Sequence, residues 1–157
     1  MISWHNEEWK GGPMGKLVFL GGTCGNNNWR EAFIAELISR GVNPDLLFNP
    51  VVEHWDEVAQ RKEEEVKATA THMLFYIADP SLEGINVSFY SGIEATMALY
   101  DKPDTTVVVF DTTGMGKHPT KAMNQATRVL KARFPKANIF ATPAEAIDWL
   151  AKQLLRQ

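Results

Sequence analysis

The sequence lacks the features of a secreted or membrane protein. Cys24 is the single cysteine among 157 residues, so no internal disulfide can form, and a reducing compartment suits such a chain. Its longest apolar runs, such as residues 105–110, have the length of a strand and fall far short of the roughly 20 apolar residues of a membrane span. The N-terminus carries no apolar signal-peptide core. We therefore expect a cytoplasmic location and no membrane partner.

Positive charge is also scarce. The formal net charge is −3, whereas a protein that binds polymeric nucleic acid needs a basic face. His54 and His118 fall in expected loops without the spacing of metal ligands, so we expect neither a metal nor a cofactor. His72 precedes a strand and is expected at the surface. The remaining partner is a small molecule, and an anion held by backbone amides is compatible with this charge.

Short apolar runs alternate with segments of helical periodicity along the chain. The expected strands cover residues 16–20, 46–49, 73–78, 105–110 and 138–140, and the expected helices cover residues 29–40, 56–69, 88–101, 120–133 and 143–155. Five such β-α units predict an α/β fold, a parallel sheet with helices on both faces. Right-handed crossovers favour a flavodoxin-like, doubly wound five-stranded sheet in the order 2-1-3-4-5.

The length suits one domain, which we place at residues 16–157. Residues 1–15 form an N-terminal extension, which could be a lid, an oligomer contact or a disordered tail. In a doubly wound sheet, ligands bind beyond the carboxyl ends of the strands. The loops that follow the first four strands are therefore the places to look for a site.

The loop after the first strand is rich in glycine. Gly21, Gly22 and Thr23 open it, and glycines let backbone amides approach a ligand closely. The loop is neither a P-loop nor a dinucleotide-binding fingerprint, because it lacks their lysine and glycine spacing. A flexible turn is the alternative, but the position after the first strand favours ligand contact.

The loop after the third strand and the helix that follows it contain a candidate nucleophile, Glu94. It lies beside an apolar face formed by Phe89, Ile93, Met97 and Tyr100, so its carboxylate is expected to point toward the sheet edge. In a cleft, such a carboxylate can act as a nucleophile or a general base. The spacing Ser91-x-x-Glu94 is also that of a capping box, in which the glutamate only reaches back to the helix start.

Several further residues have two possible roles. Trp29 and Trp55 could stack on a base or be buried structural residues. Ser88 could hydrogen-bond a 5′-hydroxyl or phosphate or cap its helix, and Asp79 could be a turn residue before a proline. The run of acidic residues at 63–65 is expected to be a solvated helix face.

The order of these elements resembles the nucleoside 2-deoxyribosyltransferase-like superfamily, which includes deoxynucleoside 5′-monophosphate N-glycosidases. The resemblance extends from Lys16 to Phe110. Its elements are Val18-Phe19-Leu20-Gly21-Gly22, Trp29, Phe48-Asn49-Pro50 with Trp55, a glutamate at Glu64 or Glu65, Asp79, and Ser88 followed six residues later by Glu94. The residues on either side of Glu94 differ from those usual in the family, and Ala95-Thr96-Met97 follow it here.

The resemblance implies a double displacement on a deoxynucleoside or deoxynucleotide. Glu94 would attack C1′ of the sugar and expel the base, and Asp79 would protonate the base. The substrate would contact Gly21, Gly22, Thr23, Trp29, Asn49, Trp55 and Ser88. The resemblance also implies a homo-oligomer in which a loop of a neighbouring subunit completes the site.

Three other interpretations were weighed against this one. An NAD glycohydrolase would also use a glutamate on a helix beside a ribose. A nucleotide-sensing domain would keep the pocket without turnover. A receiver domain is disfavoured, because glycines rather than an acidic pair follow the first strand.

Overall fold

The computed structural model describes residues 15–24, 29–79 and 88–156. Its strands are β1 (Val18–Gly22), β2 (Leu47–Phe48), β3 (His72–Ile77), β4 (Thr106–Phe110) and β5 (Asn138–Phe140). Its helices are α1 (Trp29–Ser39), η2 (Pro44–Leu46), α2 (Glu57–Thr69), α3 (Phe89–Asp101), α4 (Lys117–Arg133) and α5 (Pro143–Leu155). All strand pairs are parallel, and the order is β2-β1-β3-β4-β5. The predicted flavodoxin-like α/β fold is therefore confirmed. The N-terminal extension lies outside the described residues, apart from Gly15.

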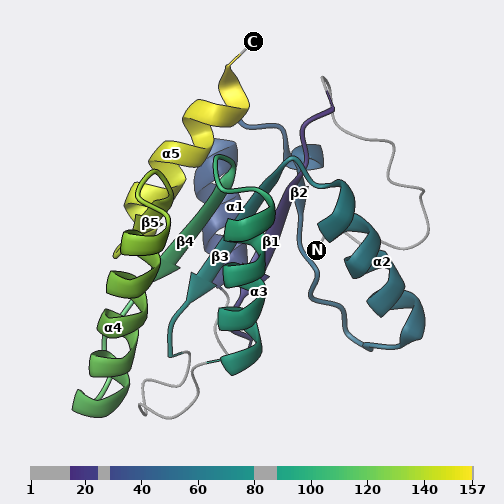
Figure 1. The fold of residues 1–157 in the computed structure, drawn as a ribbon. Coiled ribbons are helices and arrows are strands. Elements are labelled where there is room, and N and C mark those ends of the chain that lie inside the picture. The colour runs from purple at the N-terminus through teal and green to yellow at the C-terminus, as the bar shows by residue number, and fades with distance from the viewer. Residues whose placement is uncertain (1–14, 25–28, 80–87, 157) are drawn as a thin grey trace.

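Helices cover both faces of the sheet (Figure 1). One buried cluster joins α1 and α5 to the sheet through Phe33, Leu37 and Leu150. The other joins the opposite face to α2, α3 and α4 through Val66, Leu99 and Met123. Since successive side chains of a strand point to opposite faces, a strand buried on both sides reads as a continuous apolar run. All six residues of β3 are buried accordingly.

Most element boundaries lie within two residues of those expected, and two of the differences bear on the site. β1 is shifted two residues toward the C-terminus and includes both glycines, which pair with Phe75 and Tyr76 of β3. α4 begins at Lys117, three residues earlier than expected, with Gly116 as its N-cap. Both changes add ordered residues at the edge of the sheet where the strands end.

The apolar face of α3 is exposed, although apolar residues on one face of a helix usually pack on the sheet. Phe89 is 83% exposed and Met97 59%. The buried positions are instead Ser91, Ala95, Ala98 and Leu99. Small side chains let a helix approach the sheet closely, so α3 packs through its alanines and leaves its larger residues outside.

His72 is buried, contrary to the surface position expected for it. It is the first residue of β3 and is 7% exposed. Its ring lies beside Trp149 of α5, and its Nδ1 is 2.9 Å from the Thr71 hydroxyl. Burial lowers the pKa of His72 below its ordinary value, and the charge of Lys16 lowers it further. His72 is thus part of the packing between β3 and α5.

The glycines of β1 allow its end to lie against β3. Gly22 has φ of 127°, and a Cβ built there would lie 2.1 Å from the Tyr76 carbonyl oxygen. A Cβ at Gly21 would lie 2.5 Å from the Phe75 ring. Gly22 thus has both a backbone conformation that favours glycine and no room for a side chain.

We expect Gly22→Ala to lower the free energy of unfolding by at least about 2 kcal/mol, because it adds backbone strain to a clash with rigid backbone. Gly92→Ala is the matched control. Among the described residues, and apart from its chain neighbours and the backbone of α3 itself, no atom lies within 4 Å of a Cβ built at Gly92, so the change should stabilise α3 by about 0.5–1 kcal/mol. Urea unfolding of both variants measures this, and equal stabilities would contradict the close packing of β1 on β3.

Candidate active site

A cavity of about 620 Å³ lies at the carboxyl end of β1. Its wall comes from the end of β1, the residues after β2, one face of α2 and the first turns of α3. The lining residues are Phe19, Gly21, Gly22, Cys24, Arg30, Pro50, Val51, Val52, Trp55, Gln60, Glu63, Glu64, Lys67, Ser88, Tyr90, Ser91 and Glu94. Because β1 and β3 are neighbours and their crossovers lead to opposite faces, this is the switch point at which such sheets bind ligands.

An ion-paired cluster forms one wall of the cavity. Lys67 Nζ donates a hydrogen bond to Glu94 Oε2 at 2.7 Å and lies 3.1 Å from Glu63 Oε1. The side chain of Glu94 is 12% exposed, and those of Lys67 and Glu63 are each 21% exposed. A counter-ion stabilises the charge of a carboxylate this far from water. Lys67 supplies that counter-ion.

The start of α3 places Glu94 in this wall. Ser88 is the N-cap of α3, and its Oγ accepts a hydrogen bond from the Ser91 amide at 3.2 Å. The capping box between Ser91 and Glu94 does not form. Ser88 caps the helix in its place, which leaves the Glu94 carboxylate to pair with Lys67.

Lys67 stays charged in this environment. Burial on its own would lower the pKa of Lys67, but the hydrogen bonds to Glu94 and Glu63 and the charges of both carboxylates outweigh burial. The pKa therefore lies above its ordinary value. The rings of Phe19 and Tyr90 lie 5.6 and 5.8 Å from Nζ, within the range of cation–π attraction.

Arg30 supplies a second positive charge at the cavity. Its Nε donates to the Leu20 carbonyl at 2.9 Å, and its Nη atoms donate to the carbonyls of Gly22 and Thr23 at 3.0 and 3.3 Å. Burial lowers the pKa of Arg30, and the thiol of Cys24 partly offsets this. Arg30 ties α1 to the end of β1, and so fixes the shape of the glycine-containing wall.

Five of the nine predicted site residues line this one cavity: Gly21, Gly22, Trp55, Ser88 and Glu94. Trp55 is 62% exposed and lies between β2 and α2. The resemblance and the alternation of elements together predict this grouping.

Trp29 occupies the core and not the cavity. It is 4% exposed, its ring packs 5.2 Å from Phe33 and 4.9 Å from Tyr76, and its Nε1 donates to the Thr23 carbonyl at 2.8 Å. This is the structural alternative for Trp29. The prediction that it contacts substrate does not agree with this position.

Thr23, Asn49 and Asp79 are also absent from the cavity lining. Thr23 is 1% exposed, and its Oγ1 exchanges hydrogen bonds with the backbone of Ala78. Asn49 closes a turn, in which its Oδ1 accepts from the Val51 amide at 3.1 Å. Asp79, which was expected to face Glu94 across the cavity, is 2% exposed and is not among the residues that line it. The side chains of Thr23 and Asn49, which lie just beyond the ends of β1 and β2, thus hydrogen-bond the backbone.

Sequence reasoning missed the part of the wall that α2 contributes. The acidic run at 63–65 was expected to be solvated, yet Glu63 and Glu64 both line the cavity. Gln60, Glu63, Glu64 and Lys67 recur at the spacing of one helix face. That periodic polar face could have predicted that α2 lines a site. The contact between Lys67 and Glu94 could not be predicted in this way, because the two residues are 27 positions apart.

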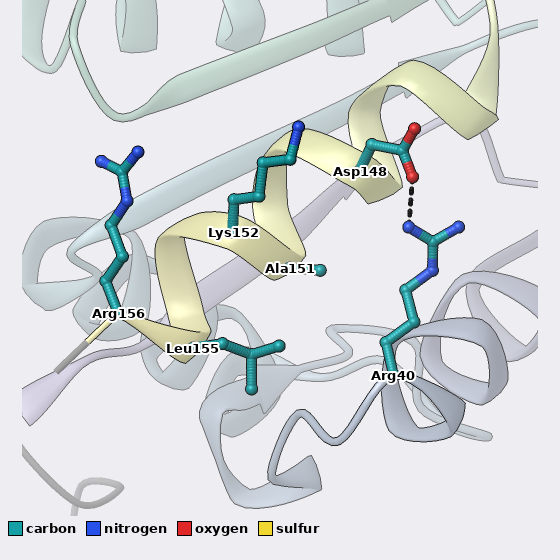
Figure 2. Close-up of a pocket in the computed structure, with 6 residues that line it drawn as sticks. All are labelled: Arg40, Asp148, Ala151, Lys152, Leu155 and Arg156. Atoms are coloured by element: carbon teal, nitrogen blue, oxygen red, sulfur yellow. Dashed lines mark hydrogen bonds and ion pairs between the residues drawn. The ribbon is translucent and has the colours of Figure 1, made fainter.

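A second depression lies between α1 and α5, at the other end of the sheet. Figure 2 shows Arg40 paired there with Asp148, with Lys152, Leu155 and Arg156 beside them. These residues come from the ends of helices that return to the amino ends of the strands, which is not where such sheets bind ligands. The candidate site is therefore the cavity at Glu94.

A doubly wound sheet with a cavity at its switch point has the architecture in which α/β proteins bind small molecules. The chain belongs to the nucleoside 2-deoxyribosyltransferase-like family, whose model matches residues 15–113. The match covers more than half of the chain and all the residues that line the cavity. At the level of the family, this indicates an enzyme of the glycosyltransferase or hydrolase type that acts on small nucleosides or nucleotides.

Among curated proteins, none matches the chain. None of the helices in the described ranges combines the length and the apolar character needed to cross a membrane. Nor do the described residues contain a group of three or more His, Cys, Asp or Glu able to hold a metal ion.

The different environments of the two tryptophans predict different effects of their removal. Trp29→Ala should lower the free energy of unfolding by about 3–5 kcal/mol, the usual effect of deleting a buried aromatic side chain. Trp55→Ala, at an exposed position, should change it by less than about 1 kcal/mol. Chemical unfolding of the two variants checks this. A larger loss for Trp55→Ala would contradict the packing described for Trp29.

Proposed function

We propose that this protein cleaves or transfers the N-glycosidic bond of a deoxynucleoside or deoxynucleotide, with Glu94 as the nucleophile. The observation that carries the proposal is that the Glu94 carboxylate lines the cavity and is bonded to Lys67 through one of its two oxygens. In the described part of the chain, its hydrogen bond to Lys67 uses Oε2 alone. Oε1 is left to attack, in a cavity large enough for a nucleoside and lined by exposed rings.

The proposed chemistry has two displacements. Oε1 of Glu94 attacks C1′ from the face opposite the base, the C1′–N bond breaks, and its electron pair leaves with the base. Water or a second base then attacks C1′ of the glycosyl ester. Splitting the reaction in this way replaces one difficult step by two easier ones. The negative charge of Glu94 also stabilises the oxocarbenium character of each transition state.

Two exposed rings at the cavity support a site for the base. Trp55 and Tyr90 are each 62% exposed and line the cavity from different elements, after β2 and at the start of α3. Aromatic rings stack on any nucleobase, because every base has a π-face. The sugar would then lie deeper, beside Glu94 and the glycines of β1.

The proton for the departing base is assigned to solvent water. Asp79 was the expected donor, but a side chain that is 2% exposed and absent from the cavity lining does not reach a bound base directly. In this proposal, Asp79 supports the end of β3. When only water protonates the departing base, the rate depends strongly on how good a leaving group that base is. Substrates with activated bases should therefore react fastest.

The identity of the substrate is tested with a panel of deoxynucleosides, deoxynucleoside 5′-monophosphates and NAD, each with a free base as acceptor. Chromatography measures the released or exchanged base. Release from at least one deoxy compound is expected. Cleavage of NAD alone would favour a glycohydrolase, and binding without any cleavage would favour a sensing domain.

We expect Glu94→Gln to lower the rate of base release at least about 1,000-fold, because the amide cannot act as the nucleophile. The variant should retain its fold, since Ser88 and not Glu94 caps α3. The matched control is Glu65→Gln on α2, an exposed carboxylate outside the cavity, which should leave the rate unchanged. Turnover by Glu94→Gln at the rate of the unsubstituted protein would exclude Glu94 as nucleophile.

A further inference from the structure

We propose that Lys67 is a positioning residue that speeds the second half of the reaction, by stabilising the Glu94 carboxylate as it leaves the glycosyl ester. This inference rests on the proposed function. It goes beyond that function, because it assigns a role to a residue of α2 and names the step on which the residue acts.

The geometry fixes the ammonium group of Lys67 from several sides. Glu94 Oε2 lies 2.7 Å from Nζ and Glu63 Oε1 lies 3.1 Å from it. The rings of Phe19 and Tyr90 flank the same group. These contacts come from β1, α2 and α3, so Lys67 is held at one point of the wall and holds Glu94 in turn.

Lys67 distinguishes the two states that Glu94 passes through. As a free carboxylate, Glu94 carries a full negative charge next to the ammonium. As a glycosyl ester, formed through Oε1, it is neutral, and Oε2 is the carbonyl oxygen that still faces Lys67. An ammonium favours the charged state over the neutral one, since hydrogen bonds to ionised groups are about twice as strong as neutral ones.

The second step therefore gains most from Lys67. Water attacks C1′, the C1′–Oε1 bond breaks, its electron pair returns to the Glu94 carboxylate, and the proton of the water passes to solvent. Negative charge develops on Glu94 as the ester breaks, and Lys67 stabilises that charge within the transition state. In the first step the same charge is consumed, so Lys67 does not favour that step.

Glu63 keeps Lys67 in place while Glu94 is esterified. When Glu94 becomes neutral, the carboxylate of Glu63, one helical turn away on α2, remains charged and bonded to Lys67. The ammonium is thus not drawn into solvent during the lifetime of the ester. Its pKa, raised by both carboxylates against the effect of burial, is consistent with a group that stays protonated.

A second lysine allows the positioning role to be separated from a purely structural one. Lys102 Nζ donates to the carbonyls of Lys67, Ala68 and Ala70 at the end of α2, at 2.9, 3.4 and 2.6 Å. Lys102 thereby attaches α2 to the end of α3. It does not line the cavity at the end of β1, although a smaller pocket between α2 and α3 is lined by both Lys102 and Glu94. Both lysines bridge α2 and α3, but only Lys67 contacts the carboxylates.

The experiment compares Lys67→Met, Lys67→Arg and Lys102→Met with the unsubstituted protein on a deoxynucleoside or deoxynucleotide that it cleaves. Rapid quenching measures the burst of base release, and mass spectrometry of the quenched protein measures the fraction held as the glycosyl ester. Thermal melting is recorded for each variant, so that a loss of fold is detected.

For Lys67→Met we expect kcat to fall roughly 10- to 100-fold, the effect of losing a charged hydrogen bond. Most of the enzyme should accumulate as the ester after a full burst. Lys67→Arg keeps the charge, so it should recover most of the turnover and show little ester. Lys102→Met should melt at a lower temperature and keep its kcat.

The inference would be overturned if Lys67→Met turned over like the unsubstituted protein, or if it lost turnover without a burst and without accumulated ester. Equal losses of turnover in Lys67→Met and Lys67→Arg, together with lowered melting in both, would assign Lys67 a structural role. These outcomes leave the proposed function intact, provided that the unsubstituted protein releases base. If it releases none, both proposals fail.

Discussion

The candidate site is organised around a largely buried carboxylate, that of Glu94, in the cavity wall. Such a charge is stabilised by a counter-ion close to it. The side chain of Glu94 is 12% exposed, and burying a charge without a partner carries a free-energy cost. Lys67 lowers that cost by bonding one carboxylate oxygen. The same bond occupies Oε2 and leaves Oε1 available for the proposed attack. The packing of α2 against α3, which brings Lys67 to Glu94, therefore affects the proposed reaction.

The fold brings this pair together through the order of its strands. β1 lies between β2 and β3, so the chain leaves the sheet toward α2 from β2 and toward α3 from β3, on the two sides of the cavity. The close approach of β1 to β3, which requires Gly22, forms the floor between them. Arg30 then fixes the end of β1 through three carbonyls. The site is thus built on strand ends and helix faces, which are more rigid than loops.

The fold was predictable because its signals are local. The continuous apolar run of β3 and the glycine that ends α1 define elements without reference to the rest of the chain. That Glu94 lines the cavity was predictable from its position on α3 and from the family resemblance. The family match confirms the resemblance at the level of the family. The role of Glu94 remains a proposal.

The remaining features depend on contacts between elements that sequence periodicity does not contain. The apolar face of α3 gave the wrong expectation, because Ala95 and Ala98 allow a closer approach to the sheet than Phe89 or Met97 would. The burial of His72 was misjudged for a similar reason, since packing across the sheet decides it, and the same packing decides between the two roles left open for Trp29. The bond between Lys67 and Glu94 joins residues 27 positions apart, and only the folded chain reveals it.

The most direct test of the central claim, a covalent displacement by Glu94, is the stereochemistry of the product. Cleavage of a 2′-deoxynucleoside in the presence of methanol would give a methyl 2-deoxyriboside, whose anomeric configuration proton NMR reads directly. Two successive inversions at C1′ retain the β configuration of the nucleoside, so the account predicts the β-methyl deoxyriboside. Formation of the α anomer would show a single direct displacement and would contradict it.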